Sequence, residues 1–131
     1  MNSRIGYQMP AYCSGSGKVL LADLLDTDRE DEIKKYRTSE KTETTITDYS
    51  TLLKELYKIK EIGYGIDKEE SEVGLTCIAV PILTYNAKPS QLSAFPAPPK
   101  ELSKMNFPTC QHSKILQIKF LSFLVLICQN Q

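Results

Sequence analysis

The stretch L-L-K-E-L-Y-K-I-K-E-I-G-Y-G-I at residues 52–66 decides the fold. Its apolar residues recur every three or four positions, which places them on one face of a helix; they are Leu52, Leu53, Leu56, Ile59 and Ile62. Upstream, Thr47 and Asp48 are candidate N-caps. Gly63 is a suitable C-cap, because glycine adopts the left-handed backbone without a steric penalty. The stretch therefore predicts an amphipathic helix that ends at Gly63.

A second segment predicts a strand downstream of this helix. The run T-C-I-A-V-P-I-L-T-Y at 76–85 is short, apolar and rich in β-branched residues, which is typical of a buried strand. Pro81 has no N–H for a sheet ladder, so we expect a sheet edge or a bulge at that point. Helix and strand together predict a mixed α/β (α+β) fold.

Upstream, the sequence predicts two further helices. The turn Ser14-Gly15-Ser16-Gly17 precedes K-V-L-L-A-D-L-L, whose apolar spacing predicts a mostly buried helix that starts at the turn. Its expected buried residues are Val19, Leu20, Leu21, Leu24 and Leu25. Asp26 or Thr27 can cap a second helix over D-R-E-D-E-I-K-K-Y, which has acids in its first turn and lysines in its last.

Size and charge limit the classes of protein. The chain has 131 residues, 41% of them apolar and 24% charged, which indicates one globular domain of ordinary size. Basic and acidic residues number 16 each, and the lysines are interspersed with acids. A stand-alone nucleic-acid binder usually carries a basic surplus or a basic stripe. The composition therefore argues against autonomous DNA binding.

The cysteines and the apolar runs exclude two kinds of site. Structural zinc needs about four nitrogen or sulfur ligands at short paired spacing, whereas this chain has one histidine and four widely separated cysteines: Cys13, Cys77, Cys110 and Cys128. The apolar run at 120–128 is shorter than the roughly 20 residues of a membrane span. We therefore expect neither a bound metal nor a membrane partner. We expect the chain to lie in the reducing cytoplasm, with its cysteines as free thiols.

Two motifs carry potential chemistry. S-G-S-G-K at 14–18 lacks both ends of a phosphate-binding loop, but a glycine turn that leads into a helix points backbone N–H groups at one spot, which favours an anion. The alternative is a plain helix start. The acids Asp67, Glu69, Glu70 and Glu72 could perform acid–base chemistry, but no histidine lies near them in sequence and a solvated loop is the simpler interpretation. No nucleophile has an evident base, so we expect no enzyme.

Four stretches, in this order, resemble the effector-binding domain of the IclR family of bacterial transcriptional regulators. They are G-Y-Q-M-P-A-Y-C-S-G-S-G-K-V-L-L-A at 6–22, T-T-I-T-D-Y-S-T-L-L at 44–53, K-I-K-E-I-G-Y-G-I-D-K-E-E at 58–70 and V-G-L-T-C-I-A-V-P-I at 73–82. The resemblance implies a partial GAF-like domain with an antiparallel sheet flanked by helices. It also implies homo-oligomers, no cofactor, and a small carboxylate or aromatic acid as effector.

The resemblance also implies site residues. Carried over by position, the effector-binding residues are Gly15 and Ser16 in the turn, then Asp67, and Cys77 ten residues later. The family adds two serines on its last strand. DNA binding belongs to a winged helix-turn-helix that precedes this domain in the family, so we expect DNA contact only through that missing N-terminal domain.

The family pattern stops after Thr84, where a strand similar to A-I-S-I-S-G-P is expected. Codons for residues 91–101 can be chosen so that a shifted frame reads A-I-S-I-S-G-P-T-K-R. We therefore predict a partial effector-binding domain at 1–84 and an aberrant, out-of-frame tail at 85–131. Loss of that strand would leave ladder N–H and C=O groups of the sheet without partners.

The predicted function is that of a truncated sensor domain from an IclR-type regulator. Two alternatives remain open. The chain could be the non-functional product of a decayed or frameshifted gene, or a stand-alone module that binds a small molecule and dimerises with itself or with an intact family member.

Overall fold

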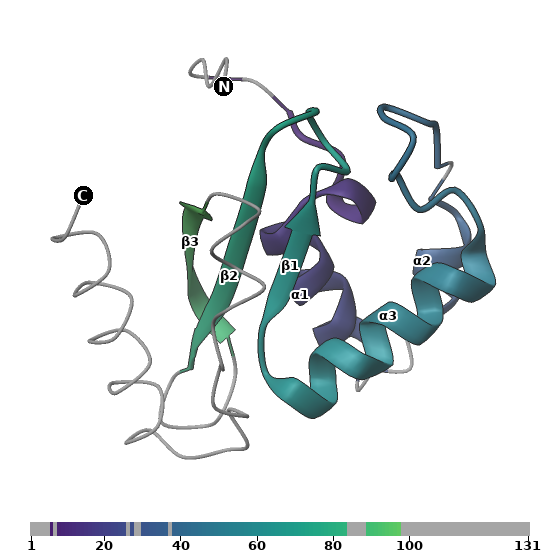
Figure 1. Cartoon of the computed structure of the whole chain (residues 1–131). Coiled ribbons are helices and arrows are strands. Elements are labelled where there is room, and N and C mark those ends of the chain that lie inside the picture. The colour runs from purple at the N-terminus through teal and green to yellow at the C-terminus, as the bar shows by residue number, and fades with distance from the viewer. Residues whose placement is uncertain are drawn as a thin grey trace, which may run out of the picture.

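The computed structural model describes residues 6, 8–25, 27, 30–36, 38–83 and 89–97. Within these residues, helices precede a three-stranded antiparallel sheet of order β1-β2-β3 (Figure 1). The elements are η1 Ala11–Cys13, α1 Gly15–Leu24, α2 Glu30–Lys34, α3 Tyr49–Ile62, β1 Gly65–Lys68, β2 Thr76–Leu83 and β3 Pro89–Ala97. The predicted α/β class, with an antiparallel sheet flanked by helices, is confirmed.

The helix predicted from the opening stretch is α3. The Asp48 carboxylate accepts a hydrogen bond from the amide of Thr51 at 2.8 Å and caps the helix. Gly63 closes it with a φ of 84°, in the left-handed region. Leu52, Leu56 and Ile59 are buried. Cap residues and apolar spacing thus predicted both ends and the buried face.

Helix α1 also forms where expected, but it begins inside the glycine turn, at Gly15. The Ser14 hydroxyl accepts the amide of Gly17 at 3.1 Å and is the N-cap. The expected burial is wrong for Leu20, which is 49% exposed, and a charged residue, Lys18, is buried completely. Spacing alone placed the apolar stripe on the helix without showing that a lysine shares its buried side.

Two glycines allow main chains to touch around α1. A Cβ on Gly17 would lie 2.4 Å from the carbonyl oxygen of Ala11 in η1. A Cβ on Gly65 would lie 2.6 Å from the carbonyl oxygen of Gly15. Since backbone atoms cannot yield as a flexible side chain can, both positions require glycine, and the start of α1 is fixed directly against β1.

Strand β2 is the predicted buried strand and lies between β1 and β3. Its pairing with β1 ends at Ala79, opposite Gly65, and a register shift lies between Ile82 and Leu83. Pro81 is therefore placed beyond the β1 ladder and next to a bulge, as predicted for a residue without an N–H.

The expectation that β2 loses its second ladder partner is wrong. Strand β3 pairs with β2 from Thr76↔Ala97 to Leu83↔Pro89. Backbone pairing does not depend on the side chains of the family's strand, and proline is tolerated in a strand at a sheet edge. The boundary predicted at residue 84, and the out-of-frame origin of residues 85–131, stay predictions.

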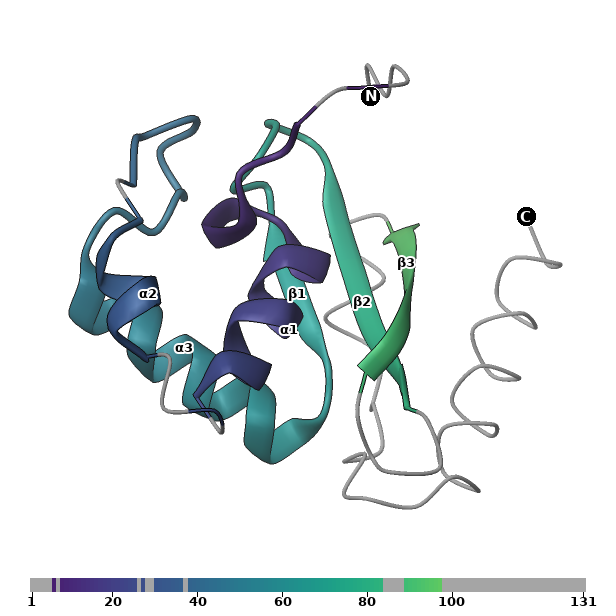
Figure 2. The same cartoon turned by 180° about the vertical axis from the view of Figure 1, so that it is seen from behind.

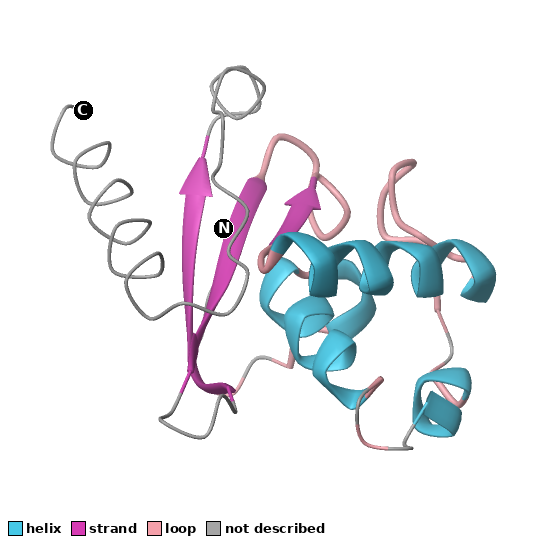
Figure 3. Ribbon diagram, turned by 90° about the horizontal axis from the view of Figure 1, so that it is seen from below, coloured by secondary structure: helices cyan, strands magenta, loops and turns pink. Residues whose placement is uncertain are grey.

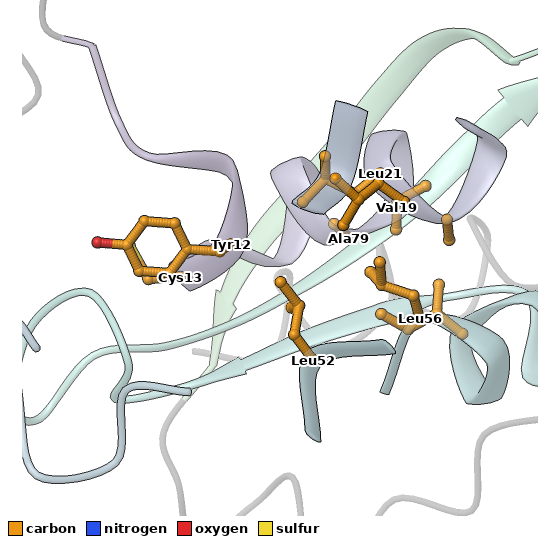
Figure 4. Close-up of a cluster of buried hydrophobic side chains, with 10 residues drawn as sticks. Tyr12, Cys13, Val19, Leu21, Leu52, Leu56 and Ala79 are labelled. Atoms are coloured by element: carbon orange, nitrogen blue, oxygen red, sulfur yellow. The ribbon is translucent and has the colours of Figure 1, made fainter. Parts of the chain in front are cut away.

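Helix α1 lies between the sheet and α3. Seen from behind and from below, the helices gather on one side of the strands (Figures 2 and 3). The core at this contact joins η1, α1, α3 and β2 (Figure 4); its labelled members are Tyr12, Cys13, Val19, Leu21, Leu52, Leu56 and Ala79. None of the described helices is long and apolar enough to cross a membrane.

Some predictions fall on residues that the structure does not describe. The cap at Asp26, the apolar run at 120–128, and Cys110, His112 and Cys128 lie outside the described residues. The second predicted helix is confirmed as the short α2, in which Ile33 is the buried residue.

Candidate functional site at the start of helix α1

The first turn of α1 keeps two backbone donors uncapped. Ser14 satisfies the later two amides of this turn, since its hydroxyl accepts from Gly17 and its carbonyl accepts from Lys18 at 2.9 Å. Among the described residues, no acceptor caps the amides of Gly15 or Ser16. Helix N-terminal amides and the helix dipole together favour an anion. The two predicted turn residues are therefore the ones whose N–H groups remain available.

These donors lie over one face of the β1–β2 pair. Asp67 and Cys77 are cross-strand partners, and Gly65 and Ala79 are the next pair on the same face. A Cβ on Gly15 would lie 3.4 Å from both the Ala79 Cβ and the Asp67 amide nitrogen. The fold therefore brings Gly15 against Asp67 and Ala79, with Ser16 next to Gly15 in the same turn and Cys77 opposite Asp67 in the sheet.

The carboxylate of Asp67 organises the turn after β1. One of its oxygens accepts the amide of Glu70 at 2.8 Å, and the other accepts the hydroxyl of Ser71 at 2.6 Å. A carboxylate oxygen can accept more than one hydrogen bond, so these contacts leave room for another donor. Asp67 is thus held rigidly while it is buried.

The expected solvated acidic loop is wrong for Asp67 and Glu70, which are both buried, and correct for the exposed Glu72. For Glu70 the reason is Lys18, whose ammonium lies 2.6 Å from the Glu70 carboxylate and 3.9 Å from that of Glu55. Buried charges require a partner. The sequence did contain a signal for the burial of Lys18. Lys18 precedes Leu21 and Ala22 by three and four residues, which places it on the same buried side of the helix.

Three threonines fix the acidic turn from the loop before α3. Thr42 and Thr44 donate their hydroxyls to the carbonyl of Glu69, at 2.7 and 2.9 Å. Thr45 donates to the carbonyl of Glu70 at 2.7 Å. Glu69 itself has a φ of 60°. The turn therefore keeps a strained backbone because side chains from a distant loop satisfy its carbonyls.

Burial raises the pKa of the Glu70 carboxyl, and Lys18 offsets part of that shift. One oxygen of this carboxylate, Oε2, is buried and has no hydrogen-bond partner among the described residues. Such atoms are uncommon in folded proteins.

The two described cysteines are free thiols. Burial raises the pKa of Cys13 and of Cys77, and the negative charge of Asp67 raises both further. A thiol that stays protonated is a poor nucleophile, so Cys77 can contribute a small surface and a weak donor. Among the described residues, no group of three histidine, cysteine or acidic side chains could hold a metal ion.

Strand β3 contributes to the face of the sheet on which Asp67 and Cys77 lie. Its residues opposite Cys77 and Ala79 are Pro96 and Ala94, both exposed. Neither has a hydroxyl group, whereas the family resemblance implies serines on the last strand. The face of the sheet beneath the start of α1 therefore has fewer hydrogen-bond donors than the family pattern implies.

A glycine-initiated helix laid across an antiparallel sheet, with uncapped amides above a buried acid, defines a small-molecule-binding domain of the α/β class. The family model of the bacterial transcriptional regulator IclR C-terminal domain matches residues 1–106. The chain belongs to this family, as the sequence resemblance predicted.

Curated relatives and solved structures support the same family. The chain is 42% identical over 79 residues to the transcriptional repressor AllR and 48% over 85 residues to the transcriptional regulator KdgR, both from Escherichia coli K12. These matches cover 60% and 63% of this chain, and 29% and 31% of the relatives. The matched part thus spans less than a third of the length of each of these two relatives.

Among solved structures, the Thermotoga maritima IclR protein superposes with a TM-score of 0.68 at 34% identity, covering 76% of this chain and 40% of the other. The C-terminal domain of E. coli KdgR gives 0.66 at 30% identity, covering 92% and 68%. Both support the fold, and the KdgR structure, which is a C-terminal domain, supports the C-terminal position of the matched segment.

Proposed function

We propose that this chain is the sensor part of an IclR-type regulator and binds a small carboxylate at the start of α1. The observation that carries the proposal is the arrangement of the free Gly15 and Ser16 amides over the Asp67–Cys77 pair. Two structural neighbours support the ligand class. The PobR inducer-binding domain from Acinetobacter, in complex with 3-hydroxybenzoic acid, is 30% identical, and a Microbacterium hydrocarbonoxydans IclR homologue with 4-hydroxybenzoate is 28% identical.

The parts of the ligand are assigned by charge. Its carboxylate lies at the amides of Gly15 and Ser16, where the helix dipole is favourable. A hydroxyl on the ligand donates to Asp67, since a second carboxylate beside this acid would be repelled. Cys77 and Ala79 form the apolar floor. An aromatic hydroxy acid or a small hydroxy acid fits this pattern better than a simple dicarboxylate.

The protein is expected to act by binding rather than catalysis, since its relatives are transcriptional regulators. AllR and KdgR are named as HTH-type regulators, and we propose that DNA contact takes place only through a helix-turn-helix domain of that kind, or through an intact family member as partner. We further propose a cytoplasmic location and association with a second copy or with an intact family member.

A titration of the full chain by NMR tests the site. Amide shifts of Gly15, Ser16 and Cys77 are followed with 3-hydroxybenzoate, with a small 2-oxo acid, and with 3-hydroxybenzyl alcohol, which lacks the carboxylate. We expect saturable shifts with at least one of the acids and none with the alcohol. Shifts that are absent with every acid, or equal with the alcohol, would contradict the proposal.

A charge variant sharpens this test. Ser16→Asp places a carboxylate at the same amides, so it should weaken binding of the acid by about tenfold or more while helix α1 keeps its favourable N-terminal charge. Leu20→Glu adds the same charge on the exposed side of α1 and is the matched control. Equal effects of the two variants would mean that the anion is not held at the helix start.

The division into a sensor part at 1–84 and an out-of-frame tail at 85–131 is also proposed, with ordinary divergence of the sequence as the rival explanation. The nucleotide sequence of the locus tests it. If a shifted frame of the codons for residues 91–101 encodes A-I-S-I-S-G-P-T-K-R, the out-of-frame origin of the tail is supported. If these codons cannot encode this strand in any frame, that origin is rejected.

A further inference from the structure

The hydroxyl group of Ser71 lies against the carboxylate of Asp67, although Ser71 is not among the effector-binding residues inferred from the sequence. This hydroxyl donates to Asp67 Oδ2 at 2.6 Å. Ser71 is partly buried, whereas Asp67 is only 2% exposed. The acid that is proposed to accept the effector's hydroxyl group is therefore already bound by a hydroxyl group of the protein.

The orientation of the Asp67 carboxylate is not determined by the strand that carries it. The contact between α1 and β1 fixes the backbone of this residue, since a Cβ on Gly15 would lie 3.4 Å from the Asp67 amide nitrogen. The last torsion angle of an aspartate side chain, however, has a broad and roughly two-fold distribution. Hydrogen-bond donors must therefore determine where the two carboxylate oxygens point.

Two donors from the turn after β1 determine this orientation. The amide of Glu70 donates to Asp67 Oδ1 at 2.8 Å, and the hydroxyl of Ser71 donates to Oδ2. Because each oxygen has its own donor, rotation of the carboxylate would break both hydrogen bonds at once. Each oxygen can still accept a further hydrogen bond, as an effector's hydroxyl group requires.

The turn that carries these donors is anchored from two directions. The Glu70 carboxylate pairs with the buried ammonium of Lys18 on α1 at 2.6 Å. From the loop before α3, the hydroxyl of Thr45 donates to the Glu70 carbonyl at 2.7 Å. Ser71 directly follows this anchored residue, so its hydroxyl is held against Asp67 before any effector binds.

We propose that Ser71 is a positioning residue of the effector site, which holds the Asp67 carboxylate in the orientation that accepts a hydroxyl group of the effector. The inference rests on the proposed function and assigns the preference for hydroxy acids to one further residue. A carboxylate that is oriented in advance loses less conformational freedom when the effector binds. Because Ser71 acts through Asp67, it affects only effectors that carry a hydroxyl group.

Two pairs of acids that differ by one hydroxyl group test the proposal, in titrations of the full chain followed by NMR. They are 3-hydroxybenzoate with benzoate, and L-lactate with propionate. The parent should prefer the hydroxy acid of each pair that binds. Ser71→Ala should lower the affinity for that hydroxy acid by about three- to tenfold and leave the affinity for its counterpart unchanged. Ser71→Thr keeps the hydroxyl group and should keep the preference.

Ser50→Ala is the matched control, because the hydroxyl of Ser50 also donates to an aspartate, Asp48, but at the start of α3. It removes the same kind of hydrogen bond and should leave the preference unchanged. The role of Ser71 is overturned by a parent that binds acids without this preference, or by a preference that persists in Ser71→Ala. It is also overturned if Ser50→Ala or Ser71→Thr loses the preference as fully as Ser71→Ala. These results leave carboxylate binding intact, whereas a parent that binds no small carboxylate contradicts the proposed function and this inference together.

Discussion

Helices α1 and α3 contact each other but are stabilised in different ways. Helix α3 has 14 residues and buries one row, Leu52, Leu56 and Ile59, while its other side faces solvent. Helix α1 has 10 residues and is covered on two sides, because the sheet lies on one side and α3 on the other (Figure 2). It buries glycines and a lysine as well as apolar residues. A helix at the centre of a small domain must satisfy contacts in more than one direction.

The difference has a functional consequence. In α3, local features suffice, namely two caps and an apolar row. Helix α1 also has a local cap, Ser14, but it depends on other segments as well: Gly17 contacts η1, Gly15 contacts β1, and Lys18 pairs with the turn after β1. The proposed ligand donors belong to the helix whose position the whole domain determines. Substitutions at Gly15, Gly17 or Lys18 should therefore disturb contacts with other segments, whereas changes at the caps of α3 act within that helix.

The largest effect is expected from Lys18→Met. The substitution leaves the Glu70 carboxylate buried without its partner, which typically costs about 3–5 kcal/mol. Urea unfolding, followed by circular dichroism, measures the loss, and complete unfolding is within this range for a small domain. The double variant Lys18→Met with Glu70→Leu removes both charges and should recover most of the stability. A single variant as stable as the parent would show that the pair is not buried in solution.

The second prediction concerns apolar residues on the two helices. Leu56→Ala in α3 empties a fully buried position and should cost about 3 kcal/mol in unfolding free energy. Leu20→Ala in α1 removes the same side chain from an exposed position, so the change should stay within about 0.5 kcal/mol. The order of these two values checks which face of each helix is buried. A larger loss of unfolding free energy for Leu20→Ala than for Leu56→Ala would mean that Leu20 lies on the buried side of α1, contrary to the structure.

The same contrast explains how much of the fold could be predicted. The boundaries of α3 were predicted because Asp48 and Gly63 act within their own helix. The burial of Lys18 was not, since its partner Glu70 is 52 residues away in sequence. Strand β3 was expected to be lost because its side chains depart from the family pattern. The pairing with β2 instead uses backbone groups, which side-chain patterns do not report.

The candidate site was predictable to a similar degree. Family resemblance indicated Gly15, Ser16, Asp67 and Cys77, and the fold gathers them, although their role in binding stays a prediction. Resemblance did not indicate that the Asp67 carboxylate is engaged by Glu70 and Ser71. The approach of Glu55 to Lys18 was not predicted either, since Glu55 resembles an ordinary solvated helix residue until Lys18 is placed beside it.

The third prediction uses the C-terminal ends of the helices. Gly63 has a φ of 84°, whereas Leu25 at the end of α1 has a φ of −62° and needs no glycine. Gly63→Ala should therefore destabilise the protein by about 1 kcal/mol, and Gly63→Asn by less, because asparagine tolerates the left-handed region better. Leu25→Ala serves as the comparison at α1. Thermal unfolding measures all three, and an alanine at position 63 that is as stable as asparagine would contradict the cap.

The smallest effect is expected at the start of α3 and depends on pH. Hydrogen bonds from Ser50 and Thr51 hold the pKa of Asp48 below its ordinary value. A lowered pKa in the folded state means that the unfolded chain takes up the proton first, so this carboxylate stabilises the fold above about pH 4 and loses that contribution as pH falls through the folded pKa. Asp48→Asn keeps an effective cap without the charge.

The parent should therefore be slightly more stable than the Asp48→Asn variant at neutral pH, and the difference should disappear in acid. Urea unfolding of both proteins between pH 3 and pH 7 measures it. Ser14→Ala is the matched change at α1, where the cap is an uncharged hydroxyl, and its effect should not vary with pH across this range. A pH-independent difference at Asp48 would mean that its charge adds nothing to the cap, and the two helix starts would then be stabilised by hydrogen bonding alone.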